Sequence, residues 1–214
     1  MESSNNNMTA ERSLEIISRT IEESRQRITR GSWKSMLIWG VAVAIIALIV
    51  GHLWKNTSAG PGANGLWGAL GLLALAEQRY EKRHPKIPQT FVSKTISQIW
   101  GSLGIMAGSI GLFMGMLALL QVSIPLPVMP APNSPESFGH IPITALVILL
   151  MGIAGMITGR ILKSTAITVC CYIAGILGSF LALVYAGPYE MVVLAGVAVV
   201  GLIVPALIIK TKEA

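Results

Sequence analysis

The chain has 214 residues, of which 53% are hydrophobic and only 12% are charged, and it contains no aspartate. A soluble domain of this length carries about a quarter charged residues, so the composition excludes that class. The formal net charge is +6, but the basic residues stand in short clusters between long apolar runs. Membrane insertion requires that arrangement, whereas a nucleic-acid-binding surface does not. The sequence therefore predicts an all-α membrane protein with no nucleic-acid partner.

The amino-terminal segment, residues 9–30, has the pattern of an amphipathic helix outside the membrane. Its apolar residues recur at helical spacing on one narrow seam, and Gly31 is expected to end the helix. Residues 1–34 contain five acids and six bases, so this region is not the strongly basic helix that anionic lipid attracts. Contact with a cytoplasmic protein partner, packing on the chain's own loops and adsorption to the bilayer remain as alternatives, the last being disfavoured. The seam residues are Leu14, Ile17, Ile21 and Ile28.

Six uncharged windows follow, and each is long enough to cross a hydrocarbon core of about 30 Å. We expect an amino-terminal region at 1–34, one compact six-helix bundle over 35–209 and a short tail at 210–214. The second window is the weakest, because glycine, proline and asparagine occupy its first half. A proline-dense stretch at 124–142 is expected to be an extended connector or a recognition loop. The windows are 35–54, 59–76, 96–121, 141–159, 165–186 and 190–209.

Lysine and arginine are strongly biased towards one side of this six-span arrangement. Fifteen of the sixteen basic residues fall on the side that holds both termini, and only Lys55 falls on the other. Because basic loops stay in the cytoplasm, both termini are expected there. Three tryptophans near the cytoplasmic ends of the spans, Trp33, Trp39 and Trp100, are expected to anchor at headgroup depth.

Two windows carry stripes of glycine on one helical face. Hydrophobicity gives helices no reason to associate in lipid, so close backbone contact has to hold them together. We expect the stripes to lie against neighbouring helices. For the third window a helix of the same chain is favoured over a second subunit, which would make a homo-oligomer. The stripes are Gly101, Gly104, Gly108, Gly111 and Gly115 in the third window and Gly152, Gly155 and Gly159 in the fourth.

Few residues in the spans can do chemistry. Glu77 ends the second window and is the best candidate functional carboxylate, with Arg160 at the base of the fourth window as a possible partner. Pro205 removes a hydrogen bond to the carbonyl of Gly201 and is expected to kink the sixth helix. The adjacent Cys170 and Cys171 are expected to be inert. No catalytic constellation, metal-ligand spacing or cofactor motif occurs, so no enzyme activity, metal or cofactor is predicted.

Two short segments, Ser13-Leu14-Glu15-Ile16-Ile17 and Leu37-Ile38-Trp39-Gly40, resemble a group of small multi-pass bacterial inner-membrane proteins. This resemblance implies a location in the bacterial cytoplasmic membrane, and it implies no activity and no functional residues. The lack of buried charge favours a non-enzymatic scaffold or regulatory subunit. The alternative is a small channel or carrier for a neutral or apolar solute, built around the glycine-rich spans and Pro205.

Overall fold

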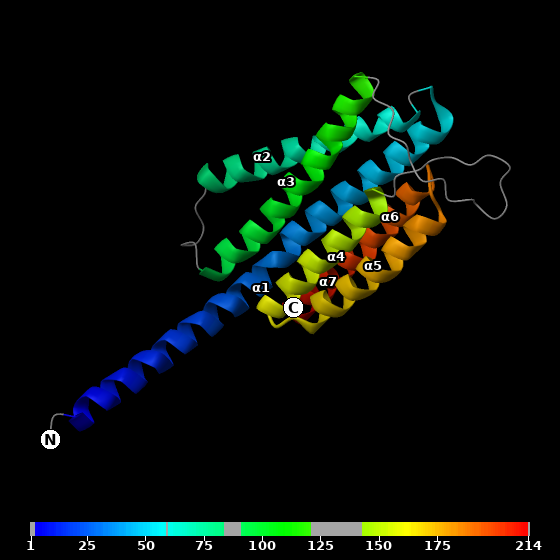
Figure 1. Cartoon of the computed structure of the whole chain (residues 1–214). Coiled ribbons are helices and arrows are strands. Elements are labelled where there is room, and N and C mark those ends of the chain that lie inside the picture. Colours follow the sequence, from blue (N-terminus) through cyan, green and yellow to red (C-terminus); the bar gives the residue numbers. More distant parts are fainter. Residues whose placement is uncertain (1–2, 59, 84–90, 121–142, 214) are drawn as a thin grey trace.

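The computed structural model describes residues 3–58, 60–83, 91–120 and 143–213, and these are almost entirely helical, without a strand. The proline-dense stretch at 124–142 lies outside the described residues. Figure 1 shows one very long helix that runs along a bundle and continues beyond it at the amino-terminal end. The elements are α1 (Ser3–Asn56), the 3-10 helix η1 (Gly60–Trp67), α2 (Gly68–Arg83), α3 (Phe91–Leu119), α4 (Ile143–Ile161), α5 (Thr165–Val184), α6 (Glu190–Ala198), the π-helical η2 (Val199–Ile203) and α7 (Val204–Glu213).

Five helices in the described residues are long and apolar enough to cross a membrane: Ala10–Asn56, Phe91–Phe113, Ile143–Ile161, Thr165–Val184 and Glu190–Thr211. The second predicted window is not among them. Its first part forms η1, and only the 16 residues of α2 are α-helical. Glycine and proline in the first part disfavour an α-helix, which explains why this window differs from the others.

The first predicted helix does not end at Gly31, because α1 continues through it into the first span. A glycine inside a helix costs only about 1 kcal/mol relative to alanine. Packing on both sides of it outweighs that cost, since Ile28, Trp33 and Met36 all lie against one cluster of buried residues in the bundle. The amino-terminal segment and the first span are therefore one helix, and no break separates them.

The glycines of α4 lie directly against α5. A Cβ built on Gly152 would stand 2.6 Å from the Cα of Gly175, and one built on Gly159 would meet the backbone of Thr168. Gly155 faces the side chain of Cys171. The two backbones thus approach as closely as glycine allows, which is the contact that small-residue stripes provide in lipid.

The glycine stripe of α3 has no such neighbour. A Cβ added at Gly101, Gly104, Gly108 or Gly111 would meet nothing within 4 Å among the described residues. The surroundings of Gly115 lie outside the described part. The expectation that a helix of the same chain covers this stripe is wrong at those four positions, because α3 meets α4 through other faces, with Trp100 bonded to Thr158.

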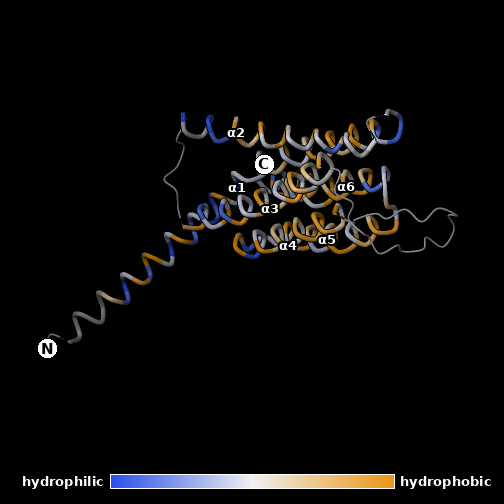
Figure 2. The backbone as a smooth tube through the Cα atoms, turned by 45° about the horizontal axis from the view of Figure 1, so that its top comes forward, coloured by the Kyte–Doolittle hydropathy of each residue, from blue (hydrophilic) through white to orange (hydrophobic). Residues whose placement is uncertain are grey.

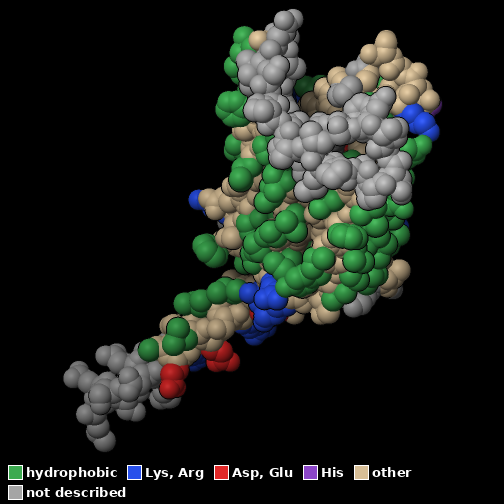
Figure 3. All heavy atoms as spheres, turned by 45° about the vertical axis from the view of Figure 1, so that its right-hand side comes forward, with side chains coloured by type: hydrophobic (Ala, Val, Ile, Leu, Met, Phe, Trp, Pro, Cys, Tyr) green, Lys and Arg blue, Asp and Glu red, His purple; other side chains and the backbone are tan. Residues whose placement is uncertain are grey.

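Two buried clusters mark the two ends of the bundle. One contains Ala47, Val50, Ala63 and Met191, with Trp54 and Trp67 packed on it. The other contains Val92, Leu162, Ile167, Cys171 and Ile209. Basic residues flank the second cluster, and Figure 3 shows them gathered where the long helix leaves the bundle. We call this side the basic end; its basic residues are Lys34, Lys94, Arg160, Lys163 and Lys210.

Candidate functional site

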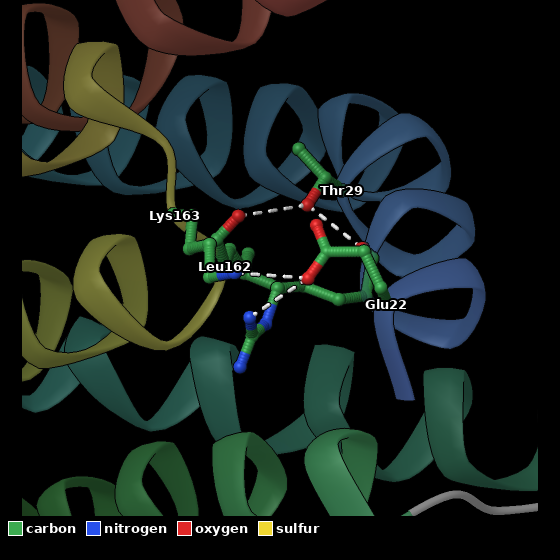
Figure 4. Close-up of polar contacts among 5 residues, drawn as sticks. Glu22, Thr29, Leu162 and Lys163 are labelled. Atoms are coloured by element: carbon green, nitrogen blue, oxygen red, sulfur yellow. Dashed lines mark hydrogen bonds and ion pairs between the residues drawn. The ribbon is translucent and has the colours of Figure 1, made fainter. Parts of the chain in front are cut away.

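The long helix is fastened to the bundle by a polar clasp at the basic end, made of Glu22, Arg25, Thr29, Leu162 and Lys163. Oε2 of Glu22 accepts hydrogen bonds from Nζ of Lys163 at 3.0 Å and from Nη1 of Arg25 at 3.1 Å. Oγ1 of Thr29 donates to the carbonyl of Arg25 at 2.9 Å and shares this proton with the carbonyl of Leu162 at 3.4 Å. Figure 4 shows these groups converging from α1 and the α4–α5 turn. The clasp joins α1 to the α4–α5 turn through a solvent-exposed ion pair, in which the side chains of Lys163 and Glu22 are 64% and 42% exposed.

The turn that supplies Lys163 has an unusual backbone. Lys163 has φ +52°, which makes it the one non-glycine residue with positive φ in the described residues. The amide of Ser164 donates to the carbonyl of Gly159, and the amide of Lys163 donates to that of Arg160. This is the Schellman end of a helix, where glycine is the usual residue. A left-handed lysine at this position costs about 1–3 kcal/mol.

The charge pair changes the titration of Glu22. The hydrogen bond from Lys163 is the main cause that lowers its pKa below the ordinary value of 4.5, and the charges of Lys163 and Arg25 act in the same direction. Burial has the opposite, smaller effect. Glu22 is therefore ionised throughout the neutral range, and the clasp is present there.

The predicted apolar seam of residues 9–30 is divided between two environments. Ile28 is partly buried against the cluster at the basic end, which agrees with the alternative that the seam packs on the chain itself. Leu14, Ile17 and Ile21 lie beyond the bundle and remain 65%, 55% and 46% exposed. Figure 2 shows this part of α1 alone, with apolar and polar residues alternating along it. The bundle thus covers Ile28 and leaves Leu14, Ile17 and Ile21 exposed.

Glu77 has partners other than the predicted one. Its Oε2 accepts a hydrogen bond from Nε1 of Trp39 at 2.7 Å, and its Oε1 accepts one from Oγ of Ser35 at 3.1 Å. Arg160, the predicted partner, donates instead to the hydroxyl of Tyr172 at 3.1 Å. Glu77 ties α2 to the long helix, and Trp39, which was expected to be an interfacial anchor, is the donor that holds it.

Pro205 is fully buried and follows the π-helical segment Val199–Ile203. The helix accommodates the missing amide by a wider turn, in which the amide of Val204 donates to the carbonyl of Val199. The thiol of Cys171 donates to the carbonyl of Gly201 at 3.5 Å. The carbonyl of Gly201, to which Pro205 has no amide hydrogen to donate, therefore accepts a hydrogen bond from α5 instead.

A cavity of about 20 Å³ lies between Trp100, α4, α5 and the π-helical segment, which is room for about one water. No group of three or more metal-ligating side chains occurs among the described residues. The polar contacts described above join helices to one another.

Comparisons with known proteins add nothing to these observations, since no family model, curated protein or solved structure matches the chain.

Sequence reasoning missed three of these contacts: Glu22 with Lys163, Trp39 with Glu77, and Cys171 with Gly201. The first joins residues 141 positions apart, and no local pattern reveals such a pair. The third carried a usable signal, because Pro205 identifies the carbonyl that needs a new donor. A buried thiol on a neighbouring helix is a weak donor suited to that position.

Proposed function

We propose that this chain is a non-enzymatic membrane scaffold or regulatory subunit that engages a protein partner through the projecting part of α1. The single observation that carries the proposal is the exposed seam of Leu14, Ile17 and Ile21 on a helix whose following turns pack on the bundle. Such a seam normally lies against another apolar surface. Here the structured bundle ends before it reaches these residues.

The chemistry of the seam suits a partner helix. Its residues are three and four positions apart, which is the spacing of helix-in-groove and coiled-coil contacts. The opposite face carries Arg19 and Glu23, paired at 2.9 Å. Three of the four exposed apolar residues of this part of α1 therefore share one face, and Ile16 lies apart from them.

The size of the seam supports a weak contact that membrane confinement strengthens. Full burial of three such side chains is worth about 4–9 kcal/mol. Association of two free molecules costs about 4–15 kcal/mol. The free energy gained by burying the seam does not by itself exceed the cost of association. A partner held at the same membrane therefore fits better than a freely diffusing one, because confinement raises its effective concentration.

The same proposal includes a sixth crossing by η1 and α2. Ala63 of η1 belongs to the buried cluster at the end opposite the basic end, while Glu77 of α2 reaches Ser35 and Trp39. Eight residues of 3-10 helix and sixteen of α-helix extend about 40 Å, which exceeds the hydrocarbon thickness of about 30 Å.

With six crossings both termini lie at the basic end, and the charge bias makes that end cytoplasmic. The projecting helix then stands in the cytoplasm. The resemblance noted above supports the cytoplasmic membrane of a bacterium as the location.

The test is site-specific photocrosslinking in cells that express the full chain. A photoreactive residue at Leu14 or Ile17 should crosslink to a distinct second protein, whereas matched positions on the opposite face, Arg12 and Arg19, should not. Equal crosslinking from both faces, or none from either, would contradict the proposal. Crosslinks only to another copy of this chain would assign the seam to a homo-oligomer instead.

A further inference from the structure

We propose that the open groove between α3 and α4 binds one anionic phospholipid from the leaflet at the basic end. The groove has a volume of about 390 Å³. It is lined by Thr95, Gln98, Ile99, Ser102, Leu103 and Met106 of α3 and by Leu150, Ile153, Ala154 and Ile157 of α4. Its wall is apolar towards the bilayer centre, and its polar side chains come from the first turns of α3.

The length of the groove fits a lipid better than a helix. Along α3 it extends from Thr95 to Met106, which is about 16 Å at 1.5 Å per residue. One leaflet of the hydrocarbon core is about 15 Å thick, whereas a spanning helix requires a contact surface of about 30 Å. The groove therefore has the depth of one acyl chain in one leaflet.

Two basic residues near the end of the groove favour a negatively charged headgroup. Lys94 lies one turn before Gln98, and Arg160 lies three residues beyond Ile157, so both are at the basic end. Neither α3 nor α4 contains an acidic residue. Arg160 donates a hydrogen bond to the hydroxyl of Tyr172 on α5, and both Arg160 and Lys94 lie beyond the lining of the groove, at its end. Two bases with no acid on either wall attract a phosphate, since basic sites between spanning helices bind anionic headgroups.

The glycine stripe of α3 plays no part in this site. At 100° per residue, Gly101, Gly104 and Gly108 point away from the face that carries Ser102 and Met106. The chain therefore offers a matched pair of serines, because Ser97 lies on the stripe face and Ser102 lines the groove, and both are exposed.

The test is native mass spectrometry of the full chain released from nanodiscs that contain equal amounts of phosphatidylglycerol and phosphatidylcholine. We expect one phosphatidylglycerol to be retained in preference to phosphatidylcholine. Each basic residue near the surface contributes about fivefold to affinity, so the double variant Lys94→Gln/Arg160→Gln should lower phosphatidylglycerol affinity about 30-fold. The control Arg79→Gln/Arg83→Gln removes two exposed bases of α2 and should leave retention unchanged.

The second arm of the test fills the groove with a bulky side chain. Ser102→Trp should abolish lipid retention, whereas Ser97→Trp should not. Unchanged retention in both Ser102→Trp and the Lys94→Gln/Arg160→Gln variant would overturn the proposal. Equal retention of the two lipids by the unmodified chain would show an apolar groove without headgroup selection and would also overturn it. So would a dimer of the unmodified chain that Ser102→Trp dissociates, because a second copy would then occupy the groove.

Discussion

The contact between Gly152 and Gly175 sets the distance between α4 and α5. Replacing Gly152 by alanine tests how much this contact contributes to the free energy of unfolding. The added Cβ would stand 2.6 Å from the Cα of Gly175 and 3.2 Å from the carbonyl oxygen of Cys171, whereas ordinary contact begins at 3.4 Å. Both neighbouring atoms belong to the backbone, so no side chain can rotate away. The helices must separate by roughly 0.8 Å at this point.

The cost follows from that separation. A gap of 0.5–1 Å loses about a quarter to a half of each atomic contact along the seam, and overpacking of a well-packed core typically costs about 1–3 kcal/mol. Alanine recovers up to about 1 kcal/mol through its better helix propensity. We therefore expect Gly152→Ala to lower the free energy of unfolding by about 1–2 kcal/mol.

Gly108→Ala in α3 is the matched control. Its Cβ meets nothing within 4 Å, so only the propensity gain remains, and stability should be unchanged or rise by up to about 1 kcal/mol. The assay is equilibrium unfolding in mixed micelles with increasing dodecyl sulfate, followed by helical circular dichroism. A Gly152→Ala variant as stable as the unmodified chain would refute the assignment of the close helix contact to α4 and α5. A Gly108→Ala variant that is clearly destabilised would contradict the open surroundings of Gly108.

Four further variants test three of the polar contacts. Trp39→Phe removes the 2.7 Å bond to the Glu77 carboxylate and should lower unfolding stability by about 1–2 kcal/mol, since hydrogen bonds to charged groups are the stronger ones; an unchanged unfolding curve would contradict the tie between α1 and α2. Cys171→Ala should destabilise more than Cys171→Ser, by about 1 kcal/mol, because serine keeps a donor for the carbonyl of Gly201; equal loss in both would argue against that bond. The clasp should weaken in acid, because Glu22 has a lowered pKa: its contribution is complete above about pH 4.5, the unfolded value, and is lost as the pH falls through the lower folded value. The stability difference between the unmodified chain and Lys163→Gln, measured over pH, should therefore be constant near neutrality and vanish in acid, and a pH-independent difference would contradict the role of Glu22.

Much of the architecture could be predicted from the sequence because uncharged length is a sufficient signal for a spanning helix. Five of the six windows coincide with helices long and apolar enough to cross a membrane. The second window differs, because its glycines and Pro61 favour a 3-10 helix that hydropathy does not distinguish from a span. The continuation of α1 through Gly31 could not be predicted from local propensity, since buried contacts of Trp33 and Ile28 decide it.

The glycine stripes show the limit of pattern reasoning. The stripes of α3 and α4 have similar spacing, yet only that of α4 lies against a neighbouring backbone. A stripe permits close approach without specifying which helix approaches. Glu77 shows the same limit for polar residues. Its position at the end of the second window marked it as a carboxylate that needs a partner, but its hydrogen-bond donor in the structure is Trp39, and Arg160 is bonded to Tyr172 instead.

The account depends most on the projecting helix and both chain ends lying on the cytoplasmic side, with η1 and α2 completing a sixth crossing. A topology map with reporters fused at the amino terminus, after Asn56, after Arg83 and at the carboxyl terminus measures this directly. We expect the reporter after Asn56 alone to be outside the cytoplasm. Chain ends on opposite sides of the membrane, or a reporter after Arg83 on the same side as the one after Asn56, would contradict the account.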